Sequence, residues 1–200
     1  MLPPIFEKYA ALFEENGFSL YMVGGSSRDY LLGRAFTDYD LVTDATPEQM
    51  KSFLPTADFT FARFGSIKLK EEGNELDFTT LRVEGEYLDS RHPSSVSFVR
   101  EPSLDYRRRD FTINAIYIDK FGHTLDFSGG LDDLHMGIIR FIGDPRKRIE
   151  EDPLRILRAE RFARKLGFAI EAETQAAIEW GRPLLEKLNP QKVQMELKKG

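Results

Sequence analysis

The sequence predicts a mixed α/β domain followed by a small helical domain. Up to about residue 136, short apolar segments of strand length alternate with amphipathic segments of helix length, which is typical of mixed α/β domains. From Asp144 onward the strand patterns stop, and four helical segments follow one another. A chain of 200 residues is long enough for one domain with a small companion. We therefore divide it into residues 1–136 and 137–200, with the second domain truncated at its C-terminal end.

Turn and capping residues mark the elements in order. Gly17 ends the first amphipathic segment, Gly24 and Gly25 break the first apolar strand, and Thr46 precedes a proline as a helix cap. The expected helices of the first domain are 4–16, 27–32 and 47–54. Its expected strands are 19–23, 38–43, 67–70, 76–82, 113–118 and 124–127, with 83–104 as a long polar loop. The expected helices of the second domain are 145–150, 154–166, 172–180 and 190 onward.

Composition limits the chemistry. There is no cysteine, which excludes disulfides and cysteine-ligated zinc, and there are only 3 histidines. Any metal must therefore bind carboxylates, which favours hard ions such as Mg²⁺. The N-terminal residues carry glutamates and no long apolar run, so we expect a cytoplasmic protein without a membrane span. The net charge is −5, but arginine and lysine cluster at 107–109, 146–148 and 155–165, and such local basic surfaces can bind phosphates.

Asp38 and Asp40 are the central candidates for catalysis. On a strand, residues two apart project to the same face, so the two carboxylates point together while Tyr39 points away. Paired carboxylates repel each other unless a cation lies between them, and Mg²⁺ bound to substrate phosphates meets that need. The alternatives are a turn or capping role, or the paired aspartates of a sugar-nucleotide glycosyltransferase.

The glycines before this strand indicate a phosphate site. Gly24 and Gly25 permit close backbone approach, and the helix that follows offers free N–H groups with Arg28 one turn in. This arrangement suits a triphosphate. The alternative is a tight strand-to-helix turn in which Arg28 pairs with Asp29 or Asp38.

Two further segments add candidates. Asp77 alternates with apolar neighbours on a predicted strand, where it can supply a third carboxylate as base or metal ligand, or simply face solvent. Arg109 can neutralise a phosphate, and Asp110 can accept a hydrogen bond from a ribose hydroxyl. The alternative is a basic loop end with Asp110 or Thr112 as a cap, which accounts for less of the pattern.

The last candidates begin the long helix of the second domain. Asp152 is expected to be its N-cap, with Pro153 at the first helical position. At helical spacing, Arg155, Arg158 and Arg161 fall near one side. An aspartate and an arginine one turn apart can present an acceptor and donors to a nucleotide base. The alternative is a capped helix with a basic, solvent-exposed face.

Taken in order, these motifs resemble those of the class II tRNA nucleotidyltransferases (CCA-adding enzymes) and bacterial poly(A) polymerases. The motifs are Gly-Gly-x-x-Arg-Asp, Asp-x-Asp, Arg-Arg-Asp-Phe-Thr-x-Asn-Ala and Glu-Asp-x-x-Arg-x-x-Arg, and they run from about Tyr21 to Phe168. The stretch 84–99 also looks like the family's flexible loop, on the residues Tyr87, Asp89, Arg91 and Pro93.

The resemblance implies a DNA polymerase beta-like nucleotidyltransferase head followed by an all-α neck. By analogy, Asp38 and Asp40 hold two Mg²⁺ (or Mn²⁺) ions, and Asp77 assists catalysis. Gly24, Gly25, Arg28, Arg109 and Asp110 would contact the nucleotide. Asp152 and Arg155 would read its base, aided by Arg158 and Arg161. The family continues into body and tail domains that grip tRNA, and Gln191-Lys192-Val193 departs from the Glu-Arg-Ile usual in its last neck motif.

The expected activity is metal-assisted addition of CMP and AMP, from CTP and ATP, to an RNA 3′ end, most simply that of tRNA. Within the same family, the alternative is a poly(A) polymerase or an enzyme that adds only A. The long loop favours C and A addition, because members that add only C are said to lack it. An alternative of another class is a non-catalytic RNA-binding module that has kept the fold.

Overall fold

The computed structural model describes residues 1–90 and 92–199, and the chain forms two compact units. Unit 1 comprises Met1–Val83, Val96–Arg108 and Asn114–Phe127. Unit 2 comprises Glu84–Ser95, Arg109–Ile113 and Ser128–Gly200. Unit 2 therefore takes two short segments from the first two thirds of the chain in addition to the helical C-terminal part. The domain division at residue 137 stays a prediction.

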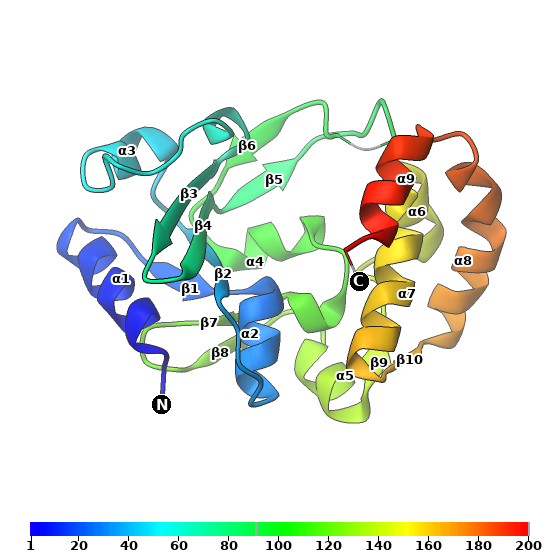
Figure 1. Cartoon of the computed structure of the whole chain (residues 1–200), viewed down its shortest axis with the longest axis horizontal. Coiled ribbons are helices and arrows are strands. Elements are labelled where there is room, and N and C mark those ends of the chain that lie inside the picture. Colours follow the sequence, from blue (N-terminus) through cyan, green and yellow to red (C-terminus); the bar gives the residue numbers. More distant parts are fainter. Residues whose placement is uncertain (91, 200) are drawn as a thin grey trace. The chain divides into compact units, whose positions relative to one another are not determined.

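Unit 1 is built on a six-stranded mixed sheet with the strand order β3-β4-β2-β1-β7-β8 (Figure 1). Its strands are β1 (Leu20–Met22), β2 (Asp38–Thr43), β3 (Ser66–Glu71), β4 (Asn74–Thr80), β7 (Ile116–Ile118) and β8 (Thr124–Asp126). Strands β2 and β4 are parallel, and every other neighbouring pair is antiparallel. The β3–β4 hairpin and the β7–β8 hairpin were both predicted from the sequence and are confirmed.

The helices of unit 1 follow the patterns of their sequences. They are α1 (Pro4–Glu15), α2 (Gly24–Leu31), α3 (Pro47–Lys51) and α4 (Pro102–Asp105), with 3-10 turns at Ala62–Phe64 and Tyr106–Arg108. In α1 the residues Phe6, Tyr9 and Phe13 recur at helical spacing and are all buried. Thr46 caps α3 as predicted, because its side chain accepts from Gln49 N and the Gln49 side chain accepts from Thr46 N.

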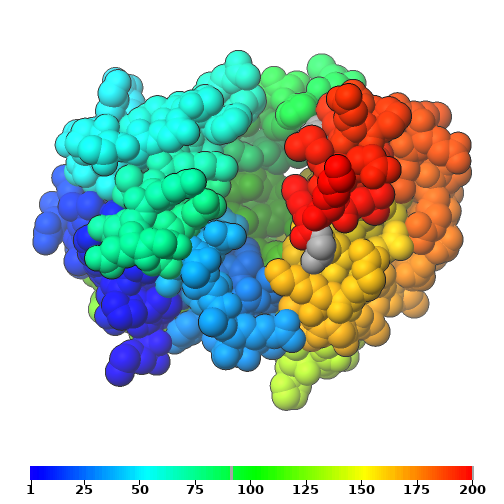
Figure 2. Space-filling view, viewed as in Figure 1, coloured from blue at the N-terminus to red at the C-terminus, as the bar shows by residue number. Residues whose placement is uncertain are grey.

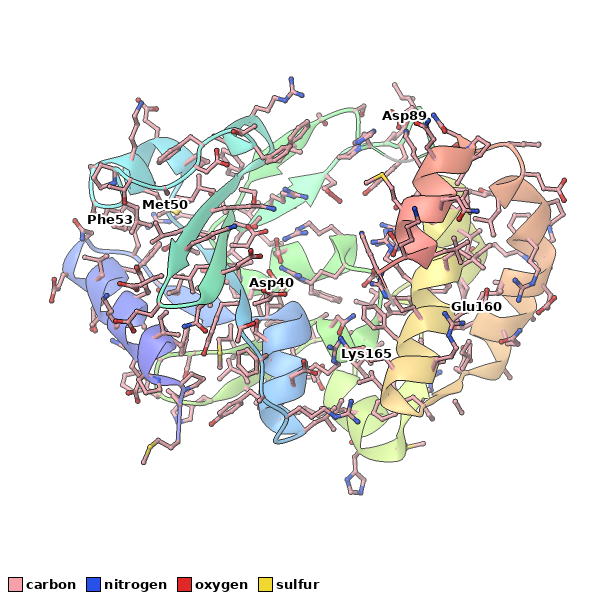
Figure 3. The ribbon with its side chains drawn as sticks, viewed as in Figure 1. Asp40, Met50, Phe53, Asp89, Glu160 and Lys165 are labelled. Carbon is pink, nitrogen blue, oxygen red and sulfur yellow. The ribbon has the colours of Figure 1, made fainter. Side chains whose placement is uncertain are left out.

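One aromatic-rich core fills unit 1 between α1, α3 and the sheet. Phe13 stacks on Phe78 with ring centroids 5.3 Å apart and meets Phe53 edge-on at 5.0 Å. Met50 is fully buried in the same core, and Figure 3 labels it beside Phe53. Aromatic pairs in these geometries add to the free energy gained from burial alone, so the sheet that carries the predicted catalytic strand rests on a rigid support.

Unit 2 is mainly helical, with a two-stranded parallel sheet (Figure 1). Its elements are α5 (Gly130–Met136), β9 (Ile138–Ile139), α6 (Pro145–Glu151), α7 (Leu154–Leu166), β10 (Ala169–Ile170), α8 (Ala172–Leu185) and α9 (Pro190–Leu197), and a 3-10 turn spans Thr112–Asn114. Helix α8 approaches α6 closely, because a Cβ on Gly181 would lie 2.6 Å from Ile149 Cγ2. Figure 3 labels Glu160 on α7, where it pairs with Arg182 of α8 at 3.0 Å.

Several expected boundaries were wrong. Helix α2 begins at Gly24 rather than at residue 27, because Gly24 adopts φ +62° and starts the turn directly after β1. The expected strand 113–118 begins only at Ile116. The expected helix 172–180 extends to Leu185 and includes Pro183.

The stretch 83–104 was predicted as a long loop, and this was wrong. It contains β5 (Arg82–Glu84), β6 (Val96–Phe98) and the start of α4, with β5 paired to β6. These strands have three residues each, too few for a periodic pattern to show in the sequence. Arg91 lies outside the described residues. Among the described residues, no helix is long and apolar enough to cross a membrane.

Candidate active site

Three aspartates lie together on one face of the sheet in unit 1. Strands β2 and β4 run parallel in a register that pairs Asp40 with Asp77 and Asp38 with Glu75. Directly paired residues project to the same face, as do residues two apart on one strand. Asp38, Asp40 and Asp77 therefore share a face, while Tyr39 is buried on the other side. The predicted orientation of the Asp-x-Asp pair is confirmed.

The first turn of α2 holds the aspartate strand in place. Ser26 Oγ accepts a hydrogen bond from Asp40 N at 2.6 Å and donates one to Asp38 O at 3.0 Å. Both bonds are made by one fully buried side chain between the two aspartates. Ser26 was not among the residues expected to form the site. The only sequence signal for it is its position in the Gly-Gly-Ser-Ser stretch, two residues into the helix.

Gly24 lets Asp40 approach that helix. Its φ of +62° is in the left-handed region, and a Cβ on it would lie 2.0 Å from Asp40 Oδ2. Any other residue would therefore clash with the carboxylate as well as strain the backbone. Figure 3 shows Asp40 near the end of α2 at which that helix begins. Gly24 thus acts on the predicted site through Asp40.

Asp77 is oriented by two hydroxyl groups. Its Oδ1 accepts from Ser66 Oγ at 2.6 Å and from Thr79 Oγ1 at 3.3 Å. Ser66 lies on β3, where the antiparallel register pairs it with Thr79. These bonds leave the side chain half-buried with its carboxylate facing the same pocket as Asp38 and Asp40.

A pocket of about 580 Å³ opens in front of these aspartates. It is lined by Gly25, Ser26, Asp38, Tyr39, Asp40, Lys68, Leu69, Lys70, Glu75, Leu76 and Asp77. One wall is the first turn of α2 and the opposite wall is β3. The pocket combines carboxylates, backbone N–H groups at a helix start and two lysines, which is chemistry suited to a metal-bound polyphosphate.

Within the described residues, no group of three or more His, Asp or Glu side chains is arranged as a complete metal site. The donor set nevertheless fits Mg²⁺. This ion is usually held by one or two carboxylates together with waters and substrate phosphates, rather than by a full protein cage. Asp38 and Asp40 supply two carboxylates at the edge of an open pocket.

Arg28 is held inside unit 1. It is 3% exposed, and its guanidinium donates to Asp29 Oδ1 at 3.0 Å and to Asn114 Oδ1 at 3.0 Å. The pairing with Asp29, which we considered as an alternative, is therefore present. A Cβ on Gly25 would lie 3.5 Å from Arg28 Nη2, so the guanidinium lies directly behind Gly25. Its contact with a nucleotide stays a prediction.

The arginine triplet 107–109 serves different purposes. Arg108 Nε donates to Asp105 Oδ1 at 2.8 Å, and Asp105 is fully buried. Arg107 is exposed. In unit 2, the backbone carbonyl of Arg109 accepts from Arg148 Nη2 at 2.8 Å. The sequence motif thus combines structural and candidate binding residues in adjacent positions.

In unit 2, Arg155 lies in a network with Arg148 and Glu151. Its Nη1 donates to Glu151 Oε2 at 3.0 Å and to Arg148 O at 2.8 Å. Arg148 Nη1 donates to the same Glu151 oxygen at 2.7 Å. Burial and the nearby Arg155 charge lower the pKa of Arg148. Arg155 is only 4% exposed, so the network fixes the direction of its guanidinium.

Tyr87 lies against the same arginine. The Arg155 guanidinium carbon is 5.6 Å from the Tyr87 ring centroid, within cation–π range. The Tyr87 hydroxyl donates to Glu84 Oε1 at 2.9 Å. Burial, together with the Glu84 charge, raises the pKa of this hydroxyl to about 12. Glu84 was not singled out from the sequence, and Arg148 was named only as part of the basic cluster 146–148, although their partners Tyr87 and Glu151 each lie three residues away.

Asp110, Asp152 and Arg158 form a second cluster in unit 2. Arg158 donates to Asp152 Oδ2, and its Nη1 donates to Asp110 Oδ2 at 3.3 Å. Burial acts to raise the pKa of Asp110. The charges of Arg158 and Arg155 outweigh it, with help from the Phe111 N–H and Arg148, and lower that pKa.

The start of α7 and the contacts of Arg161 were both subjects of sequence predictions. Asp152 was predicted as the N-cap, but the cap residue is Pro153, and Asp152 Oδ1 accepts from Leu154 N at 3.2 Å. The error is one residue, and Asp152 is instead the C-cap of α6. Arg161 Nη1 donates to buried Glu196 of α9 at 2.8 Å. Its role in base recognition stays a prediction.

Comparisons with known proteins identify the family. The family model described as the poly(A) polymerase head domain matches residues 20–140. The chain therefore belongs to this family, and its head has the polymerase beta-like nucleotidyltransferase fold.

Individual relatives agree. The chain is 43% identical to a CCA-adding enzyme of Leuconostoc mesenteroides over 93% of this chain and 46% of that protein. It is 38% identical to the CCA-adding enzyme of Geobacillus stearothermophilus over 100% of this chain and 50% of that protein. It thus spans about half the length of these curated relatives.

Solved structures give the same result. A Bacillus stearothermophilus CCA-adding enzyme in complex with CTP matches with a TM-score of 0.87 at 35% identity, covering 99% of this chain and 49% of that one. A Thermotoga maritima CCA-adding enzyme complexed with tRNA matches with a TM-score of 0.77 at 30% identity, over 98% and 47%.

Proposed function

We propose that this chain is the catalytic part of an RNA nucleotidyltransferase that adds CMP and AMP, from CTP and ATP, to the 3′ end of tRNA. The observation that carries the proposal is the row of Asp38, Asp40 and Asp77 on one sheet face, next to the first turn of α2. Residues 1–136 would act as the catalytic head and residues 137–200 as a neck. A cytoplasmic location belongs to the same proposal.

Nucleotidyltransferases of this family use divalent metal ions. We propose that Asp38 and Asp40 hold two Mg²⁺ ions, with Mn²⁺ as a substitute. When bound, the metal ions lower the pKa of the RNA 3′-hydroxyl and neutralise charge on the triphosphate. Gly24 and Ser26 keep the two carboxylates at fixed positions in the pocket, so little reorganisation is needed when the substrates arrive.

Different residues of the chain act on the attacking hydroxyl and on the triphosphate. The 3′-hydroxyl oxygen attacks the α-phosphorus, forming a new P–O bond, and the bond to the β-phosphate breaks so that pyrophosphate leaves with its electron pair. Asp77, held by Ser66 and Thr79, lies where it can accept the hydroxyl proton or serve as a further ligand. Gly25 and the free N–H groups of α2 contact the triphosphate, with Arg28 behind them supplying positive charge.

Base selection is assigned to the second unit. We propose that Asp152 and Arg155 hydrogen-bond the base edge, that Arg158 and Arg161 support them, and that Arg109 and Asp110 contact the nucleotide. The fixed direction of Arg155, set by Glu151 and Arg148, suits this role. A base with the wrong donor pattern would leave buried polar groups unpaired, at a cost of about 1–3 kcal/mol each.

The names of the relatives favour C and A addition over a purely A-adding activity. The curated relatives described above are CCA-adding enzymes, whereas the family description refers to poly(A) polymerase. Poly(A) or A-only addition therefore remains the second candidate. A non-catalytic RNA-binding module is disfavoured, because such a protein would have no need for three aspartates on one sheet face.

The test is incorporation of labelled CTP and ATP, singly and together, into tRNA that ends at the discriminator base. We expect C, C and A to be added, and we expect Asp38→Ala/Asp40→Ala to abolish addition. Asp132→Ala, which removes an exposed carboxylate of α5, is the matched control and should be fully active. Addition of A alone would support the second candidate. Normal incorporation by the double variant would overturn the proposal.

Metal binding provides a readout that does not depend on turnover. Titration with Mn²⁺, followed by its electron paramagnetic resonance signal, should show sites in the unaltered protein that are lost in Asp38→Ala/Asp40→Ala and retained in Asp132→Ala. Equal Mn²⁺ binding by all three proteins would contradict the metal assignment.

A further inference from the structure

Strand β3 places two lysines beside the carboxylates. It is the edge strand next to β4, and its register pairs Lys68 with Asp77 and Lys70 with Glu75. Paired residues share a face, so Lys68 and Lys70 lie on the carboxylate face, and both line the pocket. Lys70 forms an ion pair with Glu75 at 3.4 Å. Within the parts of the chain that the structure describes, Lys68 forms no ion pair of this kind, and its charge acts on the exposed carboxylate of Asp58, whose pKa it helps to lower.

Lys68 instead lies over an exposed aromatic ring. Its ammonium is 5.7 Å from the centroid of Phe61, which is 49% exposed. Phe61 belongs to the segment before β3, which pairs with the strand through Asp58 and Lys68 by backbone bonds of 2.7 Å and 3.1 Å. Figure 2 shows this segment and the β3–β4 hairpin side by side on the surface of unit 1. The backbone pairing holds the segment that carries Phe61 against the strand that carries Lys68.

Proteins that bind single-stranded nucleic acids commonly combine an exposed aromatic ring with a nearby lysine. Bases stack on aromatic side chains, while lysines contact the phosphates between them. Phe61 is 49% exposed, so part of its ring is available for stacking.

The order of elements also assigns this wall of the pocket to one substrate. Moving across unit 1 from the first turn of α2, the pocket shows Asp38 and Asp40 on β2, Asp77 on β4 and Lys68 on β3. The triphosphate is proposed to lie at the α2 side. The opposite side, beyond Asp77, is then available to the strand that provides the attacking hydroxyl.

We propose that Lys68 and Phe61 bind the 3′-terminal segment of the RNA, with Lys68 contacting a phosphate and a base stacking on Phe61. This inference rests on the proposed function, since it names the contact residues for the RNA at the same pocket. It concerns single-stranded RNA, and the residues involved are separate from those assigned to the nucleotide.

The experiment compares Lys68→Ala and Phe61→Ala with the unaltered chain. The matched control is Lys51→Ala, because the Lys51 ammonium lies 5.9 Å from the Phe59 ring but does not line the pocket. Binding of a 5′-labelled single-stranded RNA oligonucleotide is measured by fluorescence anisotropy at several salt concentrations. The KM values for tRNA and for CTP are measured in parallel, and thermal unfolding verifies that each variant is folded.

We expect Phe61→Ala to weaken RNA binding at least about five-fold, the lower limit for one lost stacking contact. We expect Lys68→Ala to reduce the salt dependence of log K by about 0.7, the value for one phosphate contact on a single strand. Both variants should raise the KM for tRNA and leave that for CTP unchanged, and Lys51→Ala should behave as the unaltered protein.

Two results would overturn the inference: unchanged RNA binding in both Lys68→Ala and Phe61→Ala, or a rise in the KM for CTP alone, which would assign Lys68 to the triphosphate. Because fluorescence anisotropy requires no turnover, the catalytic proposal and the RNA-binding proposal can be refuted independently of each other. RNA binding that depends on Lys68 and Phe61 in a protein without incorporation would refute only the catalytic proposal. Incorporation together with unchanged RNA binding in Lys68→Ala and Phe61→Ala would refute only the RNA site.

Discussion

The carboxylate of Asp40 packs directly on the α-carbon of Gly24, and a Cβ there would lie 2.0 Å from Asp40 Oδ2. This contact explains why the turn after β1 contains a glycine, and it links the turn to the aspartate strand. Substitution of Gly24 would therefore have two effects. It would strain the backbone, as at any left-handed position, and it would displace the Asp40 carboxylate.

Gly24→Ala is expected to abolish most of the nucleotide incorporation. Displacing a catalytic carboxylate by about 1 Å can reduce turnover on the order of 100-fold. The control is Gly33→Ala, since Gly33 also has a positive φ of +69° but nothing within 4 Å of its added Cβ. Both variants should lose about 1 kcal/mol of folding free energy. Steady-state incorporation and urea unfolding measure the two effects, and equal activities would refute the steric explanation.

Ser26→Ala removes the side chain that bridges the backbone at Asp38 and Asp40. We expect a loss of about 1–2 kcal/mol in the free energy of unfolding, because a buried N–H of Asp40 loses its acceptor. Turnover should fall roughly ten-fold as the aspartates lose their fixed position. Ser52→Ala removes an exposed hydroxyl that donates to Gln49 O, and it should change neither quantity. Unaltered turnover in Ser26→Ala would contradict the positioning role.

Glu151→Gln is expected to weaken nucleotide discrimination and also to destabilise the fold, because two buried arginines lose the charge that they share. The change removes the charge that fixes Arg155 and Arg148 but keeps a hydrogen-bond acceptor. Arg155→Ala should lower selection for CTP and ATP over UTP roughly ten-fold, and Glu151→Gln by a smaller factor. Arg164→Ala, an exposed position on α7, is the control. Competition between nucleotides gives the ratio, and an unchanged ratio in Arg155→Ala would refute the base-reading assignment.

Asp110 should make the free energy of unfolding depend on pH. Its pKa is lowered in the folded protein, because the Arg158 and Arg155 charges outweigh its burial. A lowered folded pKa means that the stabilisation is complete above the unfolded value of about 3.9 and is lost as pH falls through the folded value. Asp110→Asn should cost about 1–2 kcal/mol at pH 7, because Arg158 keeps its bond to Asp152. Urea unfolding of both proteins should show this difference shrinking below about pH 4, and a difference independent of pH would contradict the expectation.

Much of the site was predictable because its signals are local. Asp38 and Asp40 are two residues apart on one strand, so their common orientation follows from strand geometry alone. The hairpins, the capping box at Thr46 and the extent of α7 also depend on neighbours within a few residues. Their energies come from local hydrogen bonds and from periodic burial, which a single sequence displays directly.

The three-residue strands β5 and β6 were not predictable in this way, because each is stable only when paired with a partner more than ten residues away. The cap of α7 was misplaced for another reason, because Asp152 is also the C-cap of α6, which ends directly before it. Short elements gain little from their own periodicity, so the residues that stabilise them are found only in the folded chain.

By itself, the sequence determined the fold class, the aspartate pair, the glycine-rich turn and the order of the motifs. Only the tertiary structure decided that Asp77 pairs with Asp40, that Ser26 holds their strand, that Arg28 is buried against Asn114, and that Lys68 lies over Phe61. The physical reason is that hydrogen bonds and packing between residues far apart in the chain depend on strand register and helix position. These are set by the burial of the whole core, and no local pattern records them.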